Sequence, residues 1–178
     1  MASMALGRRK ALIVGSVGVA AAAAGALTAL GLLWSDSGSA ALQAAEFTDL
    51  AGKKRRLAEW KGKIIVCNFW ATWCQPCRQE IPMLIAISRQ MEAKGVEVVG
   101  IAIDHAAKVT DFARDYKITY PLLIAGPDGL DLMRATGNQV GGLPYTAFLD
   151  RKGKIVSRRL GALKESEVHQ RLADMLRS

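Results

Sequence analysis

Two cysteines separated by two residues, Cys74 and Cys77, have the spacing of a thiol–disulfide redox site. A Cys-x-x-Cys pair that follows a buried strand and opens a helix is typical of such sites. The backbone N–H groups and the positive dipole end of the helix favour the thiolate of Cys74. That thiolate can attack a substrate disulfide, and the second thiol can resolve the mixed disulfide. The sequence therefore predicts Cys74 as nucleophile and Cys77 as resolving thiol.

Two neighbours of the cysteines are also candidate site residues. Trp73 directly precedes Cys74 and is expected to shield the rim of the site. Pro76 falls in the first helical turn, where a missing N–H is tolerated. We expect both residues to contribute to the surface that meets a substrate.

A strand and a helix must position the pair. Residues 63–70 are nearly all apolar, which predicts a strand covered on both faces. Residues 75–94 have helical apolar spacing, with Gly95 as the stop. Strands are further expected at 96–103 and 121–124, helices at 108–116, 129–136 and 164–177, and hairpins at 46–57 and 145–158. This order predicts an α/β fold with a mixed sheet covered by helices.

The composition excludes several classes of protein. The chain has 178 residues, 51% of them hydrophobic, with 17 glycines and 5 prolines, so it is not a disordered chain. Three cysteines cannot form a disulfide-stapled mini-fold, and two histidines leave few ligands for a metal cage. The third cysteine, Cys67, lies in the predicted central strand and is expected to be a packed, unreactive thiol.

The N-terminal region, residues 1–36, has the pattern of a membrane anchor. Residues 11–34 carry no charge and are about 24 residues long, enough to cross a hydrocarbon core of ~30 Å. The positive cluster Arg8-Arg9-Lys10 is expected to stay in the cytoplasm, which places the rest of the chain outside or in the periplasm. A cleaved signal is the alternative, since residues 37–40 are small. We expect a linker at 37–43 and one domain at 44–178.

The charge of the chain is divided unevenly at this boundary. Residues 1–36 account for a net +2 of the total of +8, which leaves +6 on the rest. Much of it lies in two clusters, at 53–56 and 151–159. These clusters are either solvated hairpin edges or a surface that docks on anionic lipid or an acidic partner. Export of the domain argues against nucleic acid as a partner.

Two segments resemble those of a known family, the membrane-anchored TlpA/ResA-like thioredoxins. The first is Phe69-Trp70-Ala71-Thr72-Trp73-Cys74-Gln75-Pro76-Cys77-Arg78-Gln79-Glu80-Ile81-Pro82. The second is Gly142-Leu143-Pro144-Tyr145-Thr146-Ala147-Phe148-Leu149-Asp150. The resemblance as a whole covers roughly residues 44–178.

This resemblance implies a thioredoxin fold with an N-terminal hairpin and a central insertion. It implies that Pro144 is cis and packs opposite the Cys74 thiol. There Leu143 would offer its backbone groups to an extended protein substrate.

Two residues depart from related patterns. Asn68 stands where ordinary thioredoxins carry a buried acid, and an amide cannot accept the proton that leaves Cys77. Glu80, three residues after Cys77 and thus on a neighbouring helix face, is the expected replacement. Tyr145 follows Pro144 where the cytochrome-maturation branch of the family often has an acid, which argues against assignment to that branch.

The expected function is reduction of protein disulfides, without cofactor or metal. Clients would be apocytochrome c or metallochaperone cysteines, and a membrane electron-donor protein would re-reduce the pair. A disulfide-introducing oxidant is one alternative, and a thiol peroxidase is a weaker one. A non-catalytic copper module using the pair and His105 is another, whereas structural zinc lacks enough ligands.

Overall fold

The strand that precedes the cysteines lies inside a seven-stranded mixed sheet. In the computed structural model, which describes residues 37–177, the strand order is β2-β1-β5-β4-β3-β6-β7. Strands β3 (Ile64–Trp70) and β4 (Val96–Ala102) run parallel, and β6 (Tyr145–Leu149) runs antiparallel to β3. Every residue of these three strands is buried. This burial explains why their sequences are almost continuously apolar.

The shorter strands complete both edges of the sheet. The predicted N-terminal hairpin is confirmed, and it joins the sheet through antiparallel pairing of its first strand with β5. The C-terminal hairpin of β6 and β7 is also confirmed. The bounds are β1 (Phe47–Asp49), β2 (Lys54–Arg55), β5 (Leu122–Ile124) and β7 (Ile155–Leu160).

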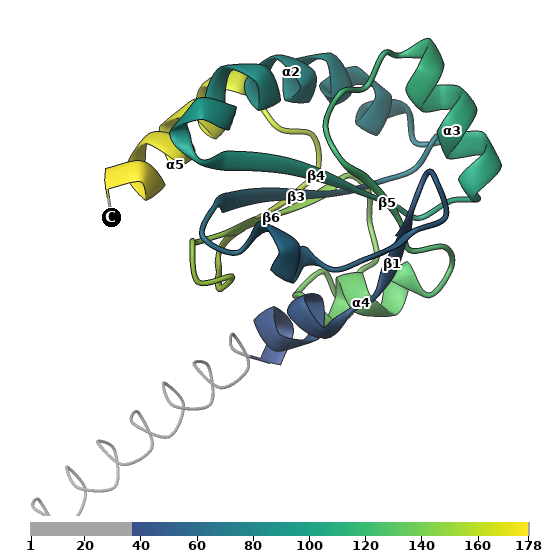
Figure 1. Ribbon diagram of the computed structural model, residues 1–178, viewed down its shortest axis with the longest axis horizontal. Coiled ribbons are helices and arrows are strands. Elements are labelled where there is room, and N and C mark those ends of the chain that lie inside the picture. Colours follow the sequence, from purple (N-terminus) through teal and green to yellow (C-terminus); the bar gives the residue numbers. More distant parts are fainter. Residues whose placement is uncertain (1–36, 178) are drawn as a thin grey trace, which may run out of the picture. The chain divides into compact units, whose positions relative to one another are not determined.

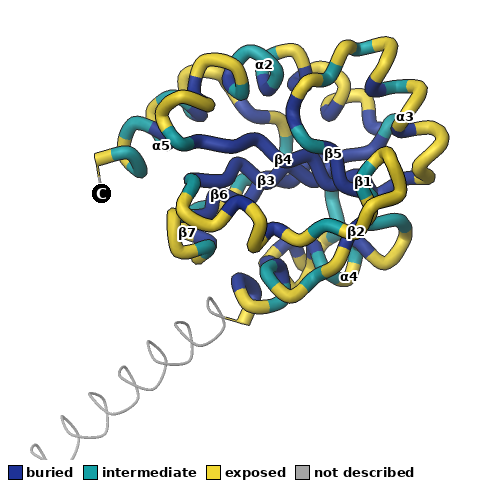
Figure 2. The backbone as a smooth tube through the Cα atoms, in the orientation of Figure 1, coloured by how far each residue is buried: buried dark blue, intermediate teal, exposed yellow. Residues whose placement is uncertain are grey.

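Helices cover both faces of the sheet, as the α/β prediction requires (Figure 1). One face carries α2 (Gln75–Met91), α3 (Ala106–Asp115) and α5 (Glu165–Arg177). The other carries α4 (Gly129–Ala135) and a short 3-10 helix, η1 (Leu57–Trp60). Each face has its own apolar core, and Figure 2 shows the buried strands between helices whose outer sides are exposed.

The helix that carries the cysteines has clear start and stop signals. Cys74 is the N-cap of α2, and proline lies in the first turn. A 3-10 turn, η2 (Glu92–Lys94), follows α2 and ends at Gly95, whose φ of 78° is left-handed. Glycine adopts this conformation without a steric penalty, so the predicted stop is confirmed.

The prediction of a linker at 37–43 is wrong. Residues 37–44 are helical, and Leu42 is fully buried in the core on the α4 side of the sheet. The Ser39 Oγ accepts a hydrogen bond from the Ile155 N–H at 3.0 Å. A Cβ on Gly38 would lie 2.8 Å from the Ala135 carbonyl oxygen, so this close approach requires glycine. The small residues here permit close packing, although their composition is typical of a linker.

The domain consequently begins before the predicted residue 44. Its compact unit extends from Asp36 to Ser178. The predicted anchor or signal, residues 1–36 with the apolar run 11–34, lies outside the part of the chain that the structure describes. From residue 37 to residue 177 there is no helix long and apolar enough to span a membrane.

The helical segment at 37–44 should contribute measurably to stability. Leu42→Ala in the full chain is expected to lower the free energy of unfolding by about 2–5 kcal/mol, because it leaves a cavity in the core. Urea denaturation measures this change. Ala40→Ser, at an exposed position of the same helix, is the control and should change stability by less than about 0.5 kcal/mol. Equal effects of the two variants would mean that the segment does not pack on the domain.

Candidate active site

Cys74 and Cys77 form a disulfide at the start of α2. Their Cα atoms are 5.3 Å apart, and the Cys74 sulfur accepts a hydrogen bond from the Cys77 N–H at 3.3 Å. Cys77 is fully buried, whereas 6% of Cys74 is exposed. Of the two residues only Cys74 has exposed surface, so an incoming group meets Cys74 first, and its role as nucleophile remains a prediction.

The residues beside the cysteines form an exposed rim. Trp73 is 67% exposed, although large aromatic side chains are usually buried, and Pro76 is also exposed. Both therefore lie on the surface that a protein substrate would approach. Their contribution to substrate binding remains a prediction.

The loop before Cys74 is held by a residue that sequence reasoning missed. Asp104 Oδ2 accepts hydrogen bonds from the Thr72 hydroxyl at 2.5 Å and the Thr72 N–H at 3.2 Å. Burial raises the pKa of Asp104, but hydrogen bonds from Thr72 and His105 outweigh it and hold that pKa below its usual value. Trp70 and Ala102 are paired at the ends of the parallel strands β3 and β4, so the segments that follow these two strands leave the sheet at the same edge. An acid just after the second parallel strand was the available signal.

The peptide bond between Leu143 and Pro144 is cis, as the family resemblance implies. Pro144 is buried and directly precedes β6, whose Tyr145 is paired with Phe69 near the end of β3. Leu143 is half-buried and packs on the same apolar core as both cysteines. The cis-proline loop thus borders the core that contains the disulfide, and a role for Leu143 and Pro144 in substrate binding remains a prediction.

Glu80 is a buried carboxylate on the cysteine helix, with only 4% of its surface exposed. Its Oε1 accepts a hydrogen bond from the Asn68 side-chain amide at 2.8 Å, and its Oε2 accepts one from the Leu163 N–H at 2.9 Å. The Asn68 amide also donates to the Thr146 hydroxyl at 3.0 Å. Asparagine at 68 therefore supplies the donor that holds Glu80 in place, which an acid could not do when ionised.

The position of Glu80 changes its acidity. Burial raises its pKa, and the hydrogen bonds from Leu163 and Asn68 only partly offset that effect, so the pKa lies above the usual value for glutamate. A carboxyl group with a raised pKa keeps its proton up to a higher pH than an ordinary glutamate does. Cys77 lies three residues earlier on the same helix, one turn away.

Cys67 is separated from the redox pair by the sheet. It is fully buried in the core on the α4 side, whereas Cys74 and Cys77 belong to the core on the α2 side. Burial strongly raises the pKa of its thiol, so it holds little thiolate to react. The free cysteine is a packing residue, as the sequence indicates.

The alternative of a copper-binding module requires metal ligands in addition to the cysteine pair. Between residues 37 and 177, no three His, Cys, Asp or Glu side chains are grouped so that they could hold a metal ion. His105 is exposed and directly precedes α3. It is therefore not part of a three-ligand site with the cysteine pair.

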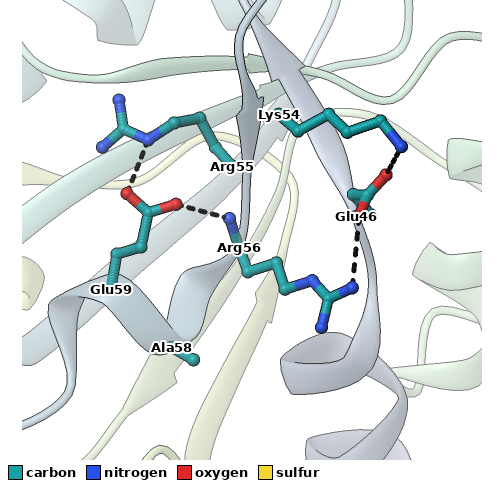
Figure 3. Close-up of a pocket in the computed structure, with 6 residues that line it drawn as sticks. All are labelled: Glu46, Lys54, Arg55, Arg56, Ala58 and Glu59. Carbon is teal, nitrogen blue, oxygen red and sulfur yellow. Dashed lines mark hydrogen bonds and ion pairs between the residues drawn. The ribbon is translucent and has the colours of Figure 1, made fainter.

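The basic cluster at residues 53–56 of the N-terminal hairpin forms ion pairs with nearby glutamates (Figure 3). Glu46 pairs with Lys54 at 2.6 Å and with Arg56 at 3.1 Å, and Glu59 pairs with Arg55 at 2.6 Å. These residues line a pocket of about 370 Å³ whose charges are largely balanced. The interpretation as a solvated hairpin edge therefore fits this cluster better than an anion-docking surface does.

The fold and the disulfide together define a class of protein. Thioredoxin-fold thiol–disulfide oxidoreductases are characterised by three features that this chain has: a mixed sheet covered by helices, a Cys-x-x-Cys disulfide at the start of the helix after a central strand, and a cis proline just before the strand that pairs antiparallel with that central strand.

Comparison with known proteins identifies the family. Residues 36–174 match the Redoxin family, and the chain belongs to it. Thiol-disulfide oxidoreductase ResA of Geobacillus thermodenitrificans is 32% identical over 126 residues, which are 70% of each chain. Thioredoxin-like protein YneN of Bacillus subtilis is 36% identical over 136 residues, 73% of this chain and 76% of that one.

Solved structures agree with these relatives. A thiol:disulfide interchange protein of the thioredoxin family from Chlorobium tepidum has a TM-score of 0.64 and 28% identity, covering 74% of this chain and 92% of that one. The chain is thus a thiol–disulfide oxidoreductase of the TlpA/ResA type.

The raised pKa of Glu80 should make stability depend on pH. The folded chain holds this proton more tightly than the unfolded chain does. The protonated carboxyl therefore stabilises the fold fully below about pH 4.3, the pKa of an unfolded glutamate, and this contribution is lost as the pH rises through the folded pKa. Glu80→Gln removes the titration. Urea unfolding of the oxidised wild type and the oxidised variant, at a series of pH values from about 4.3 upward, measures the effect. The free energy of unfolding of the wild type, relative to that of Glu80→Gln, should fall as the pH rises.

The control is Glu92→Gln, which removes an exposed carboxylate just after the same helix. A difference between wild type and Glu80→Gln that stays constant or grows with rising pH would contradict the raised pKa.

Proposed function

We propose that this protein is an extracytoplasmic thiol–disulfide oxidoreductase that works as a reductant of protein disulfides. The reduced Cys74 thiolate attacks a client disulfide, one client sulfur leaves as a thiol, and a mixed disulfide forms. Cys77 then attacks the Cys74 sulfur, which releases the second client thiol and leaves the protein oxidised. The observation that carries the proposal is the unequal access to the two sulfurs at the start of α2.

The buried carboxylate supports the reducing direction. The start of the helix stabilises a thiolate and would, acting alone, favour the reduced form. An ionised Glu80 one turn from Cys77 opposes that effect, because it repels a thiolate that lies in the same poorly solvated region. Destabilised thiolates make a dithiol a better electron donor. An ionised Glu80 can instead accept the proton that Cys77 loses, and the protonated carboxyl then no longer repels the Cys77 thiolate.

The sequence at the N-terminus supports a proposal for the location, and the location in turn supports one for the electron donor. We propose that residues 11–34 anchor the protein in the cytoplasmic membrane as a single span, with the catalytic domain on the outer side. That compartment is oxidising, so each turnover requires electrons from a membrane donor protein. A soluble periplasmic form after signal cleavage is the alternative.

Client cysteines of cytochrome c maturation or oxidase assembly are the proposed substrates. One residue argues against a close match to the cytochrome branch. Tyr145, directly after Pro144, is buried in the core on the α4 side and donates a hydrogen bond from its hydroxyl to the Thr136 carbonyl at 2.8 Å. It therefore supports the fold on the opposite face of the sheet, where an acid could not substitute for it.

The two cysteines should have separable effects on turnover. Cys74→Ala is expected to abolish reduction of insulin disulfides by the full chain. Cys77→Ala is expected to react once and accumulate a mixed disulfide through Cys74, visible as an adduct on non-reducing electrophoresis. The physical reason is that Cys77 alone is positioned to resolve that adduct.

Cys67→Ala is the matched control, since its thiol lies in the opposite core, and it should retain turnover without adducts. Activity in Cys74→Ala would overturn the assignment of the nucleophile. Stoichiometric copper uptake that Cys77→Ala abolishes, with no insulin reduction by the wild type, would instead favour the metal-binding alternative.

A further inference from the structure

A fixed guanidinium lies one helical turn after the nucleophile. Arg78 donates hydrogen bonds from Nε and Nη2 to the Tyr116 hydroxyl oxygen, at 3.1 and 2.9 Å. Its Cζ lies 5.8 Å from the centre of the Tyr116 ring and 5.9 Å from that of Phe112. These two rings stack with centroids 3.9 Å apart. An exposed arginine is thus held against two stacked rings, which lowers the entropy that a ligand must remove to order it.

This guanidinium has no carboxylate partner within the part of the chain that the structure describes. Neighbouring charges of α3 behave differently: Arg114 pairs with both Asp111 and Asp115, at 3.0 and 3.4 Å. The Tyr116 hydroxyl accepts from Arg78, so its own hydrogen is left to donate elsewhere. Arg78 and Tyr116 therefore present positive charge and N–H and O–H donors, with no internal acid to neutralise them.

Arg78 and Tyr116 line an open hollow that also includes the residues on either side of Cys74. This hollow has a volume of about 510 Å³ and is lined by Trp73, Gln75, Arg78, Gln79 and Tyr116. Its other polar side chains are neutral amides, which can donate without adding a competing negative charge. The backbone N–H of Arg78 donates a hydrogen bond to the Cys74 carbonyl oxygen at 3.1 Å, so Arg78 lies one helical turn from the nucleophile.

We infer that this hollow recognises an aspartate or glutamate side chain that lies close to the target disulfide in a client polypeptide. The inference rests on the proposed reduction of protein disulfides and adds a rule for client choice. A planar guanidinium binds a carboxylate through two parallel hydrogen bonds, and a pre-ordered one loses little entropy in doing so. Trp73, exposed at the edge of the same hollow, offers an apolar surface to the client backbone and methylene groups.

Matched disulfide peptides test this rule. Each pair is identical except for one position flanking the reactive cysteine, which holds Glu in one peptide and Gln in the other, and the set scans the flanking positions on both sides. The reduced full-length protein reacts with each peptide, and kcat/KM is measured for both members of a pair. The ratio of the two values cancels any effect of Arg78 on the thiolate of Cys74, because both peptides meet the same thiolate.

The wild type should prefer the Glu peptide by about three- to tenfold at one or more positions, the range of a well-oriented but solvent-accessible arginine–carboxylate pair. Arg78→Ala should bring that ratio close to one, and Tyr116→Phe should lower it, because the guanidinium loses its anchor. High salt should reduce it as well. The control is Arg89→Ala, which removes an exposed arginine near the other end of α2 and should keep the wild-type ratio.

Two failures can be told apart. Reduction of all peptides with equal rates for Glu and Gln at every position, in wild type and Arg78→Ala alike, would overturn the carboxylate rule and leave the reductase intact. A wild type that reduces no peptide would overturn the proposed function and the rule with it.

Discussion

A buried carboxylate ties together the parts of the molecule that surround the redox pair. Glu80 belongs to the cysteine helix and accepts hydrogen bonds from Asn68 in the central strand and from the backbone of Leu163 before the last helix. Each donor reduces the cost of burying the group, which would otherwise be several kcal/mol for an unpaired charge. The helix that carries the disulfide is thereby fixed to the sheet at the level of the resolving cysteine.

Two opposing electrostatic effects meet at this point. The N-terminus of α2 favours negative charge on the cysteines, whereas Glu80 disfavours it whenever the carboxyl is ionised. On the solvent side lie Cys74, the more accessible cysteine, and Arg78, which has no carboxylate partner among residues 37–177. In the proposed account, Glu80 adjusts the redox chemistry from beneath the disulfide, and Arg78 influences client choice from the solvent side.

Local signals in the sequence predicted the cysteine pair, the strand before it, the helix after it and the terminal hairpin. Glu80 could be predicted from the absence of an acid at Asn68, but its partner Leu163 comes from the far end of the chain, and no local pattern indicates such a contact. The same holds for Tyr116 beneath Arg78. The helix at 37–44 could not be predicted from the sequence, because the composition of this segment is typical of a linker. Its helical structure depends on tertiary packing of Leu42 and Gly38.

The central claim is that the buried carboxylate makes this pair a reductant. Equilibration of the full chain with glutathione redox buffers, at a pH where Glu80 is ionised, measures the reduction potential directly. The account predicts a wild-type potential below about −200 mV, far from the about −120 mV of a strong oxidant whose reduced form is stabilised. It also predicts a shift to a more oxidising value in Glu80→Gln. A wild-type potential near the oxidising end, or no shift in the variant, would contradict it.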